Sequence, residues 1–249
     1  MPGMPASTAP RIGCAGWSIA SRDAHLFGPG ESMLARYATR FSAVEINSSF
    51  YRPHQRKTYE RWAATVPAGF RFSVKLPRTV SHDAGLVGTG PLLDRFLDEV
   101  GGLGAKLGGL LLQLPPSLAL DTRRAASFFA ALSRRSQAAV VCEPRHASWF
   151  TAQADALLQR YGIARAAVDP ARFAAAGQPG GAQRWHYWRW HGSPRMYYSD
   201  YPDAALAGLA AQVAARRIPG RAPWVIFDNT AHGFAVANAA RLQHMVSDA

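Results

Sequence analysis

The chain has few cysteines, few lysines and no long uncharged apolar run. Lys106 interrupts the best candidate for such a run, around Leu103 to Leu114, so no stretch reaches the roughly 18 residues that indicate a membrane helix. We therefore expect no membrane partner. Cys14 and Cys142 each lie in an apolar segment and are too few for a disulfide framework. This pattern favours a reducing, cytoplasmic location.

The N-terminal sequence MPGMPASTAP also lacks the basic and apolar regions of a secretory signal peptide. We expect residues 1–10 to form a frayed tail and residues 11–249 to form a single domain, because no linker, repeat or charge block divides them. The chain has 249 residues, of which 48% are hydrophobic. This is enough for one sizeable core, and it is close to the length of a typical α/β barrel.

Positive charge exceeds negative charge in this chain. There are 28 Lys and Arg residues against 16 Asp and Glu residues, which gives a formal net charge of +12. The sequence pI is about 10.5. Such a balance favours a small anionic molecule or a nucleic acid as partner. An excess of basic residues spread over the surface, with no such partner, would give the same numbers. Only three of the basic residues are lysines, so Lys75, which lies inside a strand-like segment, stands out.

Strand-like and helix-like patterns alternate along the chain. Eight strand-like segments begin near residues 12, 43, 71, 109, 138, 163, 186 and 224. Amphipathic patterns between them predict helices over residues 32–40, 57–65, 91–100, 122–135, 148–161, 203–217 and 235–246. Residues 170–184 are rich in Ala, Gly and Pro, which predicts a short or missing helix after strand six. The order is typical of an α/β protein, a single (β/α)8 TIM barrel.

Strand alternation predicts where the polar side chains point. In a parallel barrel the outer face of each strand lies under helices, so polar residues within strands are expected to point inward, near the carboxyl-terminal end. The inward set is Glu45, Asn47, Ser73, Lys75, Gln113, Glu143, Arg145, Asp169, Arg189, His191 and Asp228, with Trp17 at the end of strand one. Apolar neighbours such as Val44, Val168 and Trp188 are assigned to the helix-facing side.

This polar ring has two interpretations. It is either a functional pocket or a structural network of paired charges that fills the barrel and fixes its register. Burying so many charges costs several kcal/mol per ion, and aliphatic side chains pack a barrel interior at lower cost. The pocket is therefore the favoured interpretation.

Several motifs occur in a characteristic order. They are GCAGWS (13–18), VEINSSFYRP (44–53), FRFSVKLPRTVSHD (70–83), LGGLLLQLPPSL (107–118), EPRHASWF (143–150), YWRWHG (187–192) and FDNTAHGFAVANAARL (227–242). Together they resemble the domain of unknown function 72 family, also called YecE-like. The resemblance covers nearly the whole chain. It implies a TIM-barrel fold and no established reaction.

The resemblance also marks individual positions. They are Trp17, Glu45, Asn47, Tyr51, Lys75, His82, Gln113, Glu143, Arg145, His146, Trp149, Arg189, His191, Gly192 and Asn229. Two positions depart from the family pattern. Asp228 stands where the family more usually has Asn, and Pro144 replaces an aromatic residue. Because of the first departure, we rank a charge-dependent role for Asp228 below the roles of Glu45 and Glu143.

The first functional hypothesis is a metal-independent lyase, isomerase or hydrolase that acts on a small anionic substrate bearing a phosphate or carboxylate. Glu45 and Glu143 are the predicted general acid and base, and Lys75, Arg145 and Arg189 are predicted to hold the anion. Lys75 is alternatively a Schiff-base nucleophile or the ion-pair partner of a glutamate. The predicted catalytic residues are Glu45, Lys75, Glu143 and Asp169. The predicted substrate-binding residues are Trp17, Asn47, Tyr51, His82, Gln113, Arg145, Arg189, His191, Asp228 and Asn229.

Two alternatives stay open. A divalent-metal hydrolase or nuclease would use carboxylates and histidines of the ring, but no tight ligand spacing supports it and neighbouring basic residues would compete with the ion, so no cofactor is predicted. A nucleic-acid-binding protein would use residues 184–201, where aromatic residues alternate with Arg189, His191 and Arg195. Trp188 and Trp190 in that segment are assigned to the helix-facing side. The sequence does not indicate an oligomeric state.

Overall fold

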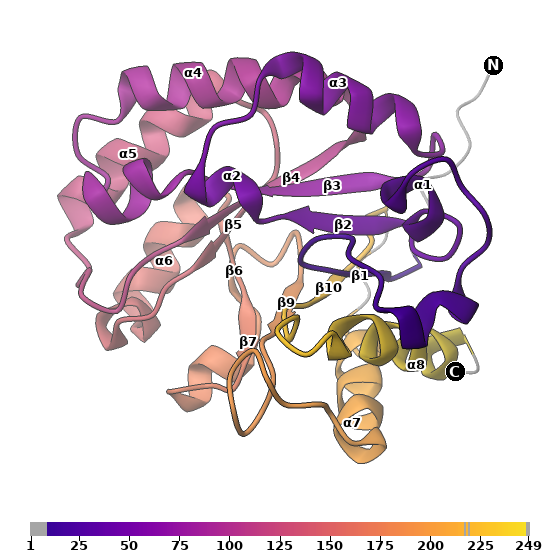
Figure 1. The fold of residues 1–249 in the computed structure, drawn as a ribbon. Coiled ribbons are helices and arrows are strands. Elements are labelled where there is room, and N and C mark those ends of the chain that lie inside the picture. Colours follow the sequence, from indigo (N-terminus) through magenta and orange to yellow (C-terminus); the bar gives the residue numbers. More distant parts are fainter. Residues whose placement is uncertain (1–8, 217, 219, 248–249) are drawn as a thin grey trace.

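Parallel strands lie at the centre of the fold and helices surround them (Figure 1). The computed structural model describes residues 9–216, 218 and 220–247. Of the predicted tail, residues 1–8 lie outside the described residues. Residue 217, at the end of one predicted helix, and residues 248–249 at the end of the predicted domain also lie outside them.

Each predicted strand segment contains a strand. The strands are β1 (Arg11–Cys14), β2 (Ala43–Ile46), β3 (Arg71–Lys75), β4 (Leu107–Gln113), β5 (Val140–Glu143), β6 (Ala164–Arg165), β7 (Ala167–Asp169), β9 (Tyr187–Trp190) and β10 (Trp224–Phe227). The sixth predicted strand is thus divided at Ala166 into β6 and β7. A further short strand, β8 (Gly180–Gly181), pairs antiparallel with β6.

The strands form two sheets, in the orders β1-β10-β9-β7 and β2-β3-β4-β5-β6-β8. Apart from the β6–β8 pair, neighbouring strands are parallel. The sheets approach each other twice. Ala15 forms a parallel bridge with Glu45, and the chain passes from β6 directly into β7. The α/β class and the parallel strands are confirmed, but the hydrogen-bonded sheet does not close into one continuous eight-stranded barrel.

The seven predicted helices are present with shifted ends, and one further helix, α2 (Ser48–Tyr51), lies in a segment for which no helix is predicted. The others are α1 (Met33–Tyr37), α3 (Arg56–Thr65), α4 (Gly90–Val100), α5 (Thr122–Arg135), α6 (Ala152–Arg160), α7 (Asp203–Ala214) and α8 (Phe234–Ser247). The predicted helix 148–161 is broken, because Thr151 caps α6 by accepting a hydrogen bond from the Ala154 amide. A four-residue 3-10 helix, Ala174–Gly177, occupies the segment where a short or missing helix is predicted.

Two other expectations can be compared with the structure. Cys14 and Cys142 are both free and buried, so they form no disulfide bond. Within the described part of the chain, the helices are all too short or too polar to cross a membrane.

The two faces of the strands bury separate clusters of side chains. The outer cluster contains Val44, Leu112 and Trp188 together with apolar residues of the helices, whereas Leu111 and Tyr187 belong to an inner cluster. In β2, β4 and β9 the side chains therefore alternate as predicted. The polar residues of these strands share the parity of the inner cluster, which directs them to the centre of the molecule.

The predicted orientation of strand six is wrong. Ala164 and Ala166 lie in the inner cluster and Ala167 lies in the outer cluster, so Val168 points inward and Asp169 points outward. Asp169 has a partner on the outer side, because the Tyr201 hydroxyl donates a hydrogen bond of 2.7 Å to its carboxylate.

Candidate active site

Arg189 on β9 is the centre of a buried cluster of charges at the carboxyl-terminal ends of the strands. Its side chain is completely buried. The guanidinium donates to Glu45 over 3.0 and 2.7 Å, to Asp228 over 3.1 Å, and to Glu143. Burial alone would lower the pKa of Arg189, but the three carboxylates outweigh it and raise that pKa well above its usual value. Little donor capacity remains for a ligand, contrary to the predicted role in holding an anion.

Glu143, at the end of β5, is bound through both carboxylate oxygens. Gln113 lies opposite it in the β4–β5 register and donates a hydrogen bond of 2.8 Å to Oε1, and the Arg145 Nε donates to the same oxygen over 3.1 Å. The other oxygen accepts from Arg189. Burial would raise the pKa of Glu143, but Arg189 and His191 together hold it well below its usual value. Glu143 is therefore a carboxylate at neutral pH and has no proton to donate as a general acid.

His191 lies between two of these carboxylates. Its Nδ1 is 3.0 Å from an Asp228 oxygen and its Nε2 is 3.5 Å from a Glu143 oxygen. Burial would lower the pKa of His191, but the two carboxylates raise it above its usual value. The imidazole is thereby favoured as a cation, which can donate a proton near neutral pH.

Asp228 on the far side of His191 is itself a charged group. Burial would raise its pKa, but Arg189 and His191 outweigh this and lower it. Asn47 donates a hydrogen bond of 3.3 Å to its other oxygen. Asp228 therefore contributes its charge to the cluster, although the sequence ranks a charge-dependent role for it low.

Lys75, at the end of β3, has no carboxylate partner. Among the described residues nothing lies within hydrogen-bond or ion-pair distance of its amine, and the amine lies 4.1 Å from the centre of the Phe50 ring. The residue is only 6% exposed. Burial, together with the positive charge of Arg189, lowers the pKa of Lys75 to about 8, although Glu143 and Glu45 act in the opposite direction. A substantial fraction of this amine is therefore neutral near physiological pH.

The motif that follows β2 explains how Lys75 is held. The chain turns at once into α2, where the Ser49 hydroxyl donates hydrogen bonds to the carbonyls of Ile46 (3.1 Å) and Lys75 (2.6 Å). This fixes α2 across the ends of β2 and β3. The next residue, Phe50, then covers the Lys75 amine, while Tyr51 is 78% exposed. The motif thus joins two neighbouring strands at the site.

Two contributors to the site, Tyr187 and Phe50, are missing from the sequence-based prediction. Tyr187 donates a hydrogen bond of 2.9 Å to Glu45, and Phe50 lies against Lys75. Tyr197, in the loop after β9, packs its ring edge against His191 at 5.8 Å. Strand parity could have identified Tyr187, because it lies two residues before Arg189 on the same strand. No comparable signal marks Phe50.

Other predicted site residues lie apart from the cluster. Asp169 is bound to Tyr201, as described above, and Asn229 donates to the Ser199 carbonyl (2.9 Å) and to Asn238 (2.7 Å). These two residues anchor the loop that follows β9 and do not contact the charge cluster.

The remaining two predicted residues, Trp17 and His82, each pack against an aromatic ring. Trp17 packs edge-on against Trp62 of α3, with ring centres 5.0 Å apart. His82 lies in a π-helix, Thr79–Asp83, and packs against Phe50 at 4.9 Å. Burial lowers the pKa of His82, and the nearby charge of Lys75 lowers it further.

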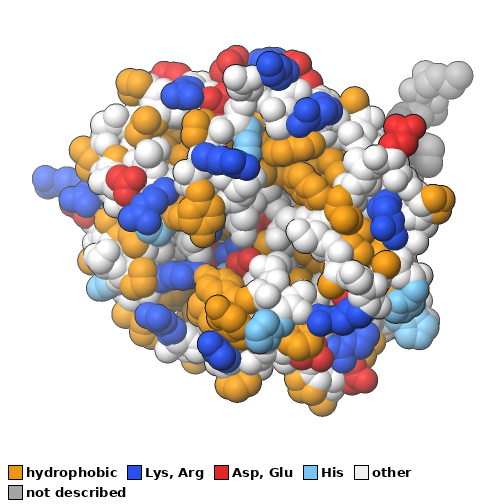
Figure 2. All heavy atoms as spheres, in the orientation of Figure 1, with side chains coloured by type: hydrophobic (Ala, Val, Ile, Leu, Met, Phe, Trp, Pro, Cys, Tyr) orange, Lys and Arg blue, Asp and Glu red, His pale blue; other side chains and the backbone are white. Residues whose placement is uncertain are grey.

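A hollow opens above the cluster. Figure 2 shows that this face of the molecule is hollowed near its centre, with acidic and basic side chains visible inside. One enclosed part has a volume of about 30 Å³ and is lined by Glu143, Arg145, Arg172 and His191 together with apolar residues. This volume holds about one water molecule or one small group.

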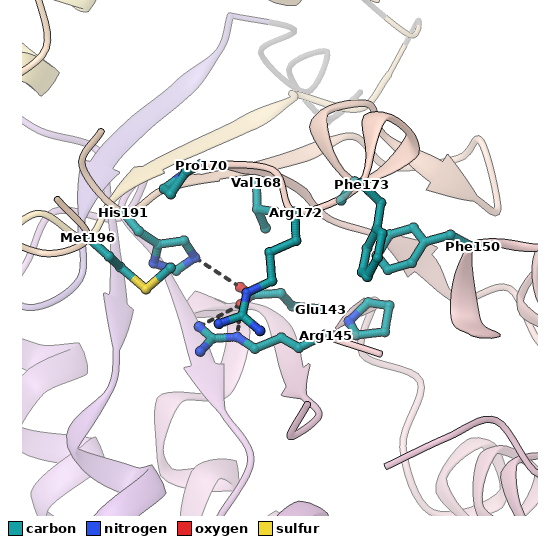
Figure 3. A pocket seen from close by; sticks show the side chains of 11 residues that line it. Glu143, Arg145, Phe150, Val168, Pro170, Arg172, Phe173, His191 and Met196 are labelled. Atoms are coloured by element: carbon teal, nitrogen blue, oxygen red, sulfur yellow. Dashed lines mark hydrogen bonds and ion pairs between the residues drawn. The ribbon is translucent and has the colours of Figure 1, made fainter. Parts of the chain in front are cut away.

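Arg172 is a further basic residue that the sequence-based prediction omits. In Figure 3 its side chain and that of Arg145 point toward each other beside Glu143. Arg172 is exposed and has no hydrogen bond or ion pair within the described part of the chain. Unlike Arg189, it is therefore available to a ligand.

The fold and the site together define a parallel α/β protein with a buried charge cluster at the carboxyl-terminal ends of its strands. The model of the family described as "Protein of unknown function DUF72" matches residues 11–249. The chain therefore belongs to the DUF72 family, which confirms the resemblance of its motifs.

Relatives and solved structures agree with this assignment. The chain is 35% identical to the UPF0759 protein YecE of Escherichia coli K12 over 86 residues, which is 34% of this chain and 32% of YecE. A DUF72 family protein from Thermotoga maritima MSB8 matches with a TM-score of 0.79 at 22% identity, covering 96% of this chain and 99% of that one. A DUF72 family protein from Enterococcus faecalis V583 gives 0.79 at 19% identity, covering 97% and 99%. These structural matches show a shared fold.

Proposed function

We propose that this protein is an enzyme that acts on a small anionic substrate at the carboxyl-terminal mouth of its strands. The observation that carries the proposal is the buried amine of Lys75, which lies beside three carboxylates and is paired with none of them. A purely structural network would pair this charge, because a buried unpaired ion costs several kcal/mol. An apolar side chain would give a more stable protein at this position.

The residues divide into two groups in this proposal. Lys75 and His191 exchange protons with the substrate, because burial lowers the pKa of Lys75 to about 8 and the neighbouring carboxylates raise the pKa of His191. Arg145 and Arg172 hold its anionic group. A second set fixes the geometry of the first, namely Glu45, Gln113, Glu143, Arg189 and Asp228. Glu45 and Glu143 are thus positioning residues here and not the general acid and base.

We also propose that the two sheets act as one eight-stranded barrel. The bridge between Ala15 and Glu45 joins one pair of edges, and the continuous chain through Ala166 joins the other. The cluster contacts between β2, β5, β9 and β10 span both sheets, which supports one interior. A cytoplasmic location belongs to the same proposal and is supported by two free, buried thiols.

The proposed chemistry needs no metal ion. The Arg189 guanidinium occupies the position between Glu45, Glu143 and Asp228 where a divalent cation would bind. In the part of the chain that the structure describes, no three His, Cys, Asp or Glu side chains are grouped to hold such an ion. A metal-dependent hydrolase is therefore less well supported.

A nucleic-acid partner is also less well supported. Trp188 and Trp190 of the aromatic and basic segment are buried in the outer cluster, where they cannot stack on bases. Tyr198 is partly exposed, and Arg195 lies 4.2 Å from its ring centre. A single pair of this kind suits the rim of a small-molecule site better than an extended surface that binds along a nucleic-acid strand.

Calorimetric titration with inorganic phosphate, pyrophosphate and small dicarboxylates tests the proposed anion site. We expect saturable binding at one site for at least one of these anions. The Arg172→Gln variant should bind about tenfold more weakly or worse, because a charge-assisted hydrogen bond contributes roughly 1.5–3 kcal/mol. Its folding should be unaffected, since Arg172 has no partner among the described residues.

Arg134→Gln is the matched control, because Arg134 is an exposed arginine on α5, away from the site. It should bind like the unmodified protein. Absence of saturable binding for every anion, or equal weakening in both variants, would contradict the proposed site.

A further inference from the structure

We propose that Lys75 is a nucleophile that captures a carbonyl group of the substrate as an imine, so that the substrate is a small anionic aldehyde or ketone. This inference rests on the proposed function and names the substrate class of the same site. It assigns to Lys75 a covalent step in addition to proton exchange.

The first support is the geometry around the amine. Ser49 binds the Lys75 carbonyl over 2.6 Å and so fixes the end of β3, while Phe50 covers one side of the amine at 4.1 Å. A nucleophilic amine needs a free lone pair and a fixed direction of attack. The absence of any acceptor within hydrogen-bond distance, among the described residues, leaves the amine free in this sense.

The other two lysines of the chain are in different surroundings. Lys106 donates hydrogen bonds to the carbonyls of Ala63 and Val66, which use its ammonium form. Lys57 is exposed at the start of α3. Only Lys75 therefore combines burial with an unpaired amine, and the chain contains no other lysine.

The second support is the set of charges that face Lys75. They are Glu45 on β2, Glu143 on β5, Arg189 on β9, Asp228 directly after β10, and His82 in the π-helix, whose own pKa Lys75 lowers. The three carboxylates would normally stabilise an ammonium ion, but Arg189 binds all three. Burial and the charge of Arg189 then prevail, which gives Lys75 a pKa of about 8. The unprotonated form that attacks carbonyl carbon is thus available near neutral pH.

The chemistry is balanced without any oxidant or reductant. The neutral Lys75 nitrogen forms a bond to the carbonyl carbon, and the carbonyl π electrons move to oxygen, which takes up the proton that the nitrogen loses. The resulting carbinolamine then expels its hydroxyl group as water. His191 supplies the proton for this departure, the nitrogen lone pair forms the C=N bond of an iminium ion, and the proton on that nitrogen returns to His191 to leave the neutral imine. The products are the imine and one water molecule.

Two basic residues beside the cavity suit the anionic group at the other end of such a substrate. Arg145 is partly exposed, with 24% of its side chain accessible, and Arg172 reaches the same cavity (Figure 3). Lys75 does not line this cavity, but the charge of Glu143 in its wall acts on the amine. Two guanidinium groups at the cavity and an amine beyond Glu143 would suit a molecule that carries a phosphate or carboxylate a few atoms from its carbonyl group.

Borohydride trapping with pyridoxal 5′-phosphate tests the inference, because this probe combines an aldehyde with a phosphate. The protein is incubated with limiting probe, reduced, digested and mapped by mass spectrometry. We expect labelling of Lys75 about tenfold or more above Lys57, since an ordinary lysine with a pKa near 10.4 is almost fully protonated at pH 7.5. Labelling of Lys75 should rise with pH around a midpoint near 8. Inorganic phosphate should slow it.

Three variants make the outcome clear. Lys75→Arg should abolish the rapid labelling, and Lys57→Arg, the matched control, should leave it unchanged. Lys75→Met is tested in parallel, and circular dichroism establishes that each variant is folded. Equal labelling of Lys57 and Lys75 in the unmodified protein would overturn the inference.

A titration with unreduced probe separates this inference from the proposed function. If the probe binds saturably, and more weakly to Arg172→Gln, but no adduct forms at Lys75, then the imine step is wrong and the anion site stands. If the probe and the simple anions all fail to bind, both proposals fail.

Discussion

Arg189 determines, at the scale of single residues, which charges of the site remain available. It binds Glu45, Glu143 and Asp228 through one guanidinium group. The three carboxylates are thereby prevented from pairing with Lys75, whose amine stays free. The sequence predicts both basic residues at the site, but it cannot predict this division, because Arg189 and Glu45 are 144 positions apart. Pairing over such a distance depends on the folded geometry.

Replacing Arg189 tests this division of charge. The Arg189→Met variant leaves three buried carboxylates without their common partner, so we expect a loss of about 3–5 kcal/mol in the free energy of unfolding. Urea unfolding followed by circular dichroism measures it. The exposed-arginine variant Arg134→Gln serves as control and should change stability by less than about 0.5 kcal/mol. A similarly small change for Arg189→Met would show that the cluster is not held by this residue.

The loop after β9 shows, at the scale of elements, how a helix far along the chain supports the site. Gly192 begins this loop with φ of +96°, and its amide donates to the Tyr201 hydroxyl over 2.8 Å. On α8 the buried Asn238 donates to Asp200 (2.6 Å) and accepts from Asn229. The loop that carries Tyr197 over His191 is therefore tied to α8. The sequence marks Asn229 as a site residue, but its role is to hold this loop.

Removing the amide of Asn238 should loosen that loop. For Asn238→Ala we expect faster amide hydrogen exchange in residues 193–200 and a stability loss of roughly 1–3 kcal/mol, because buried partners are left unsatisfied. Hydrogen exchange with mass spectrometry measures the first effect. Ser247→Ala, at the end of the same helix, removes a bond within that helix only and should leave the loop unchanged. Unchanged exchange in Asn238→Ala would contradict this role of α8.

Strand alternation predicts most of the inner face, because apolar residues such as Val44 and Trp188 alternate with polar ones and mark the helix-facing side. It fails at strand six for a physical reason. The strand is rich in alanine, which fits either face, and its polar residues have partners on the outer side of the sheets. Arg165 donates to Asp155 of α6, and Asp169 accepts from Tyr201. Polarity within a strand therefore indicates the interior only when the covering layer offers no partner.

The site is a property of the whole molecule, since four groups from different strands or strand ends act on the pKa of Lys75, namely Arg189, Glu143, Glu45 and Asp228. Its pKa is lower in the folded state than in the unfolded chain, so the unfolded chain binds more protons between about pH 8 and 10.5. Stability must therefore rise with pH across this window as far as Lys75 contributes. A buried amine that destabilises the folded protein and is nevertheless retained is what we expect of a reactive group.

The pKa of Lys75 is the quantity that tests the proposed site most directly. Reductive methylation with ¹³C-formaldehyde labels the three lysines, and Lys75→Arg identifies the Lys75 signal in the NMR spectrum. We expect that signal to titrate near pH 8 in the folded protein and near the ordinary lysine value of about 10.4 in urea. If the signal titrates at or above 10.4 in the folded protein, Lys75 is an ordinary paired cation, and both the proposed site and its imine chemistry are contradicted.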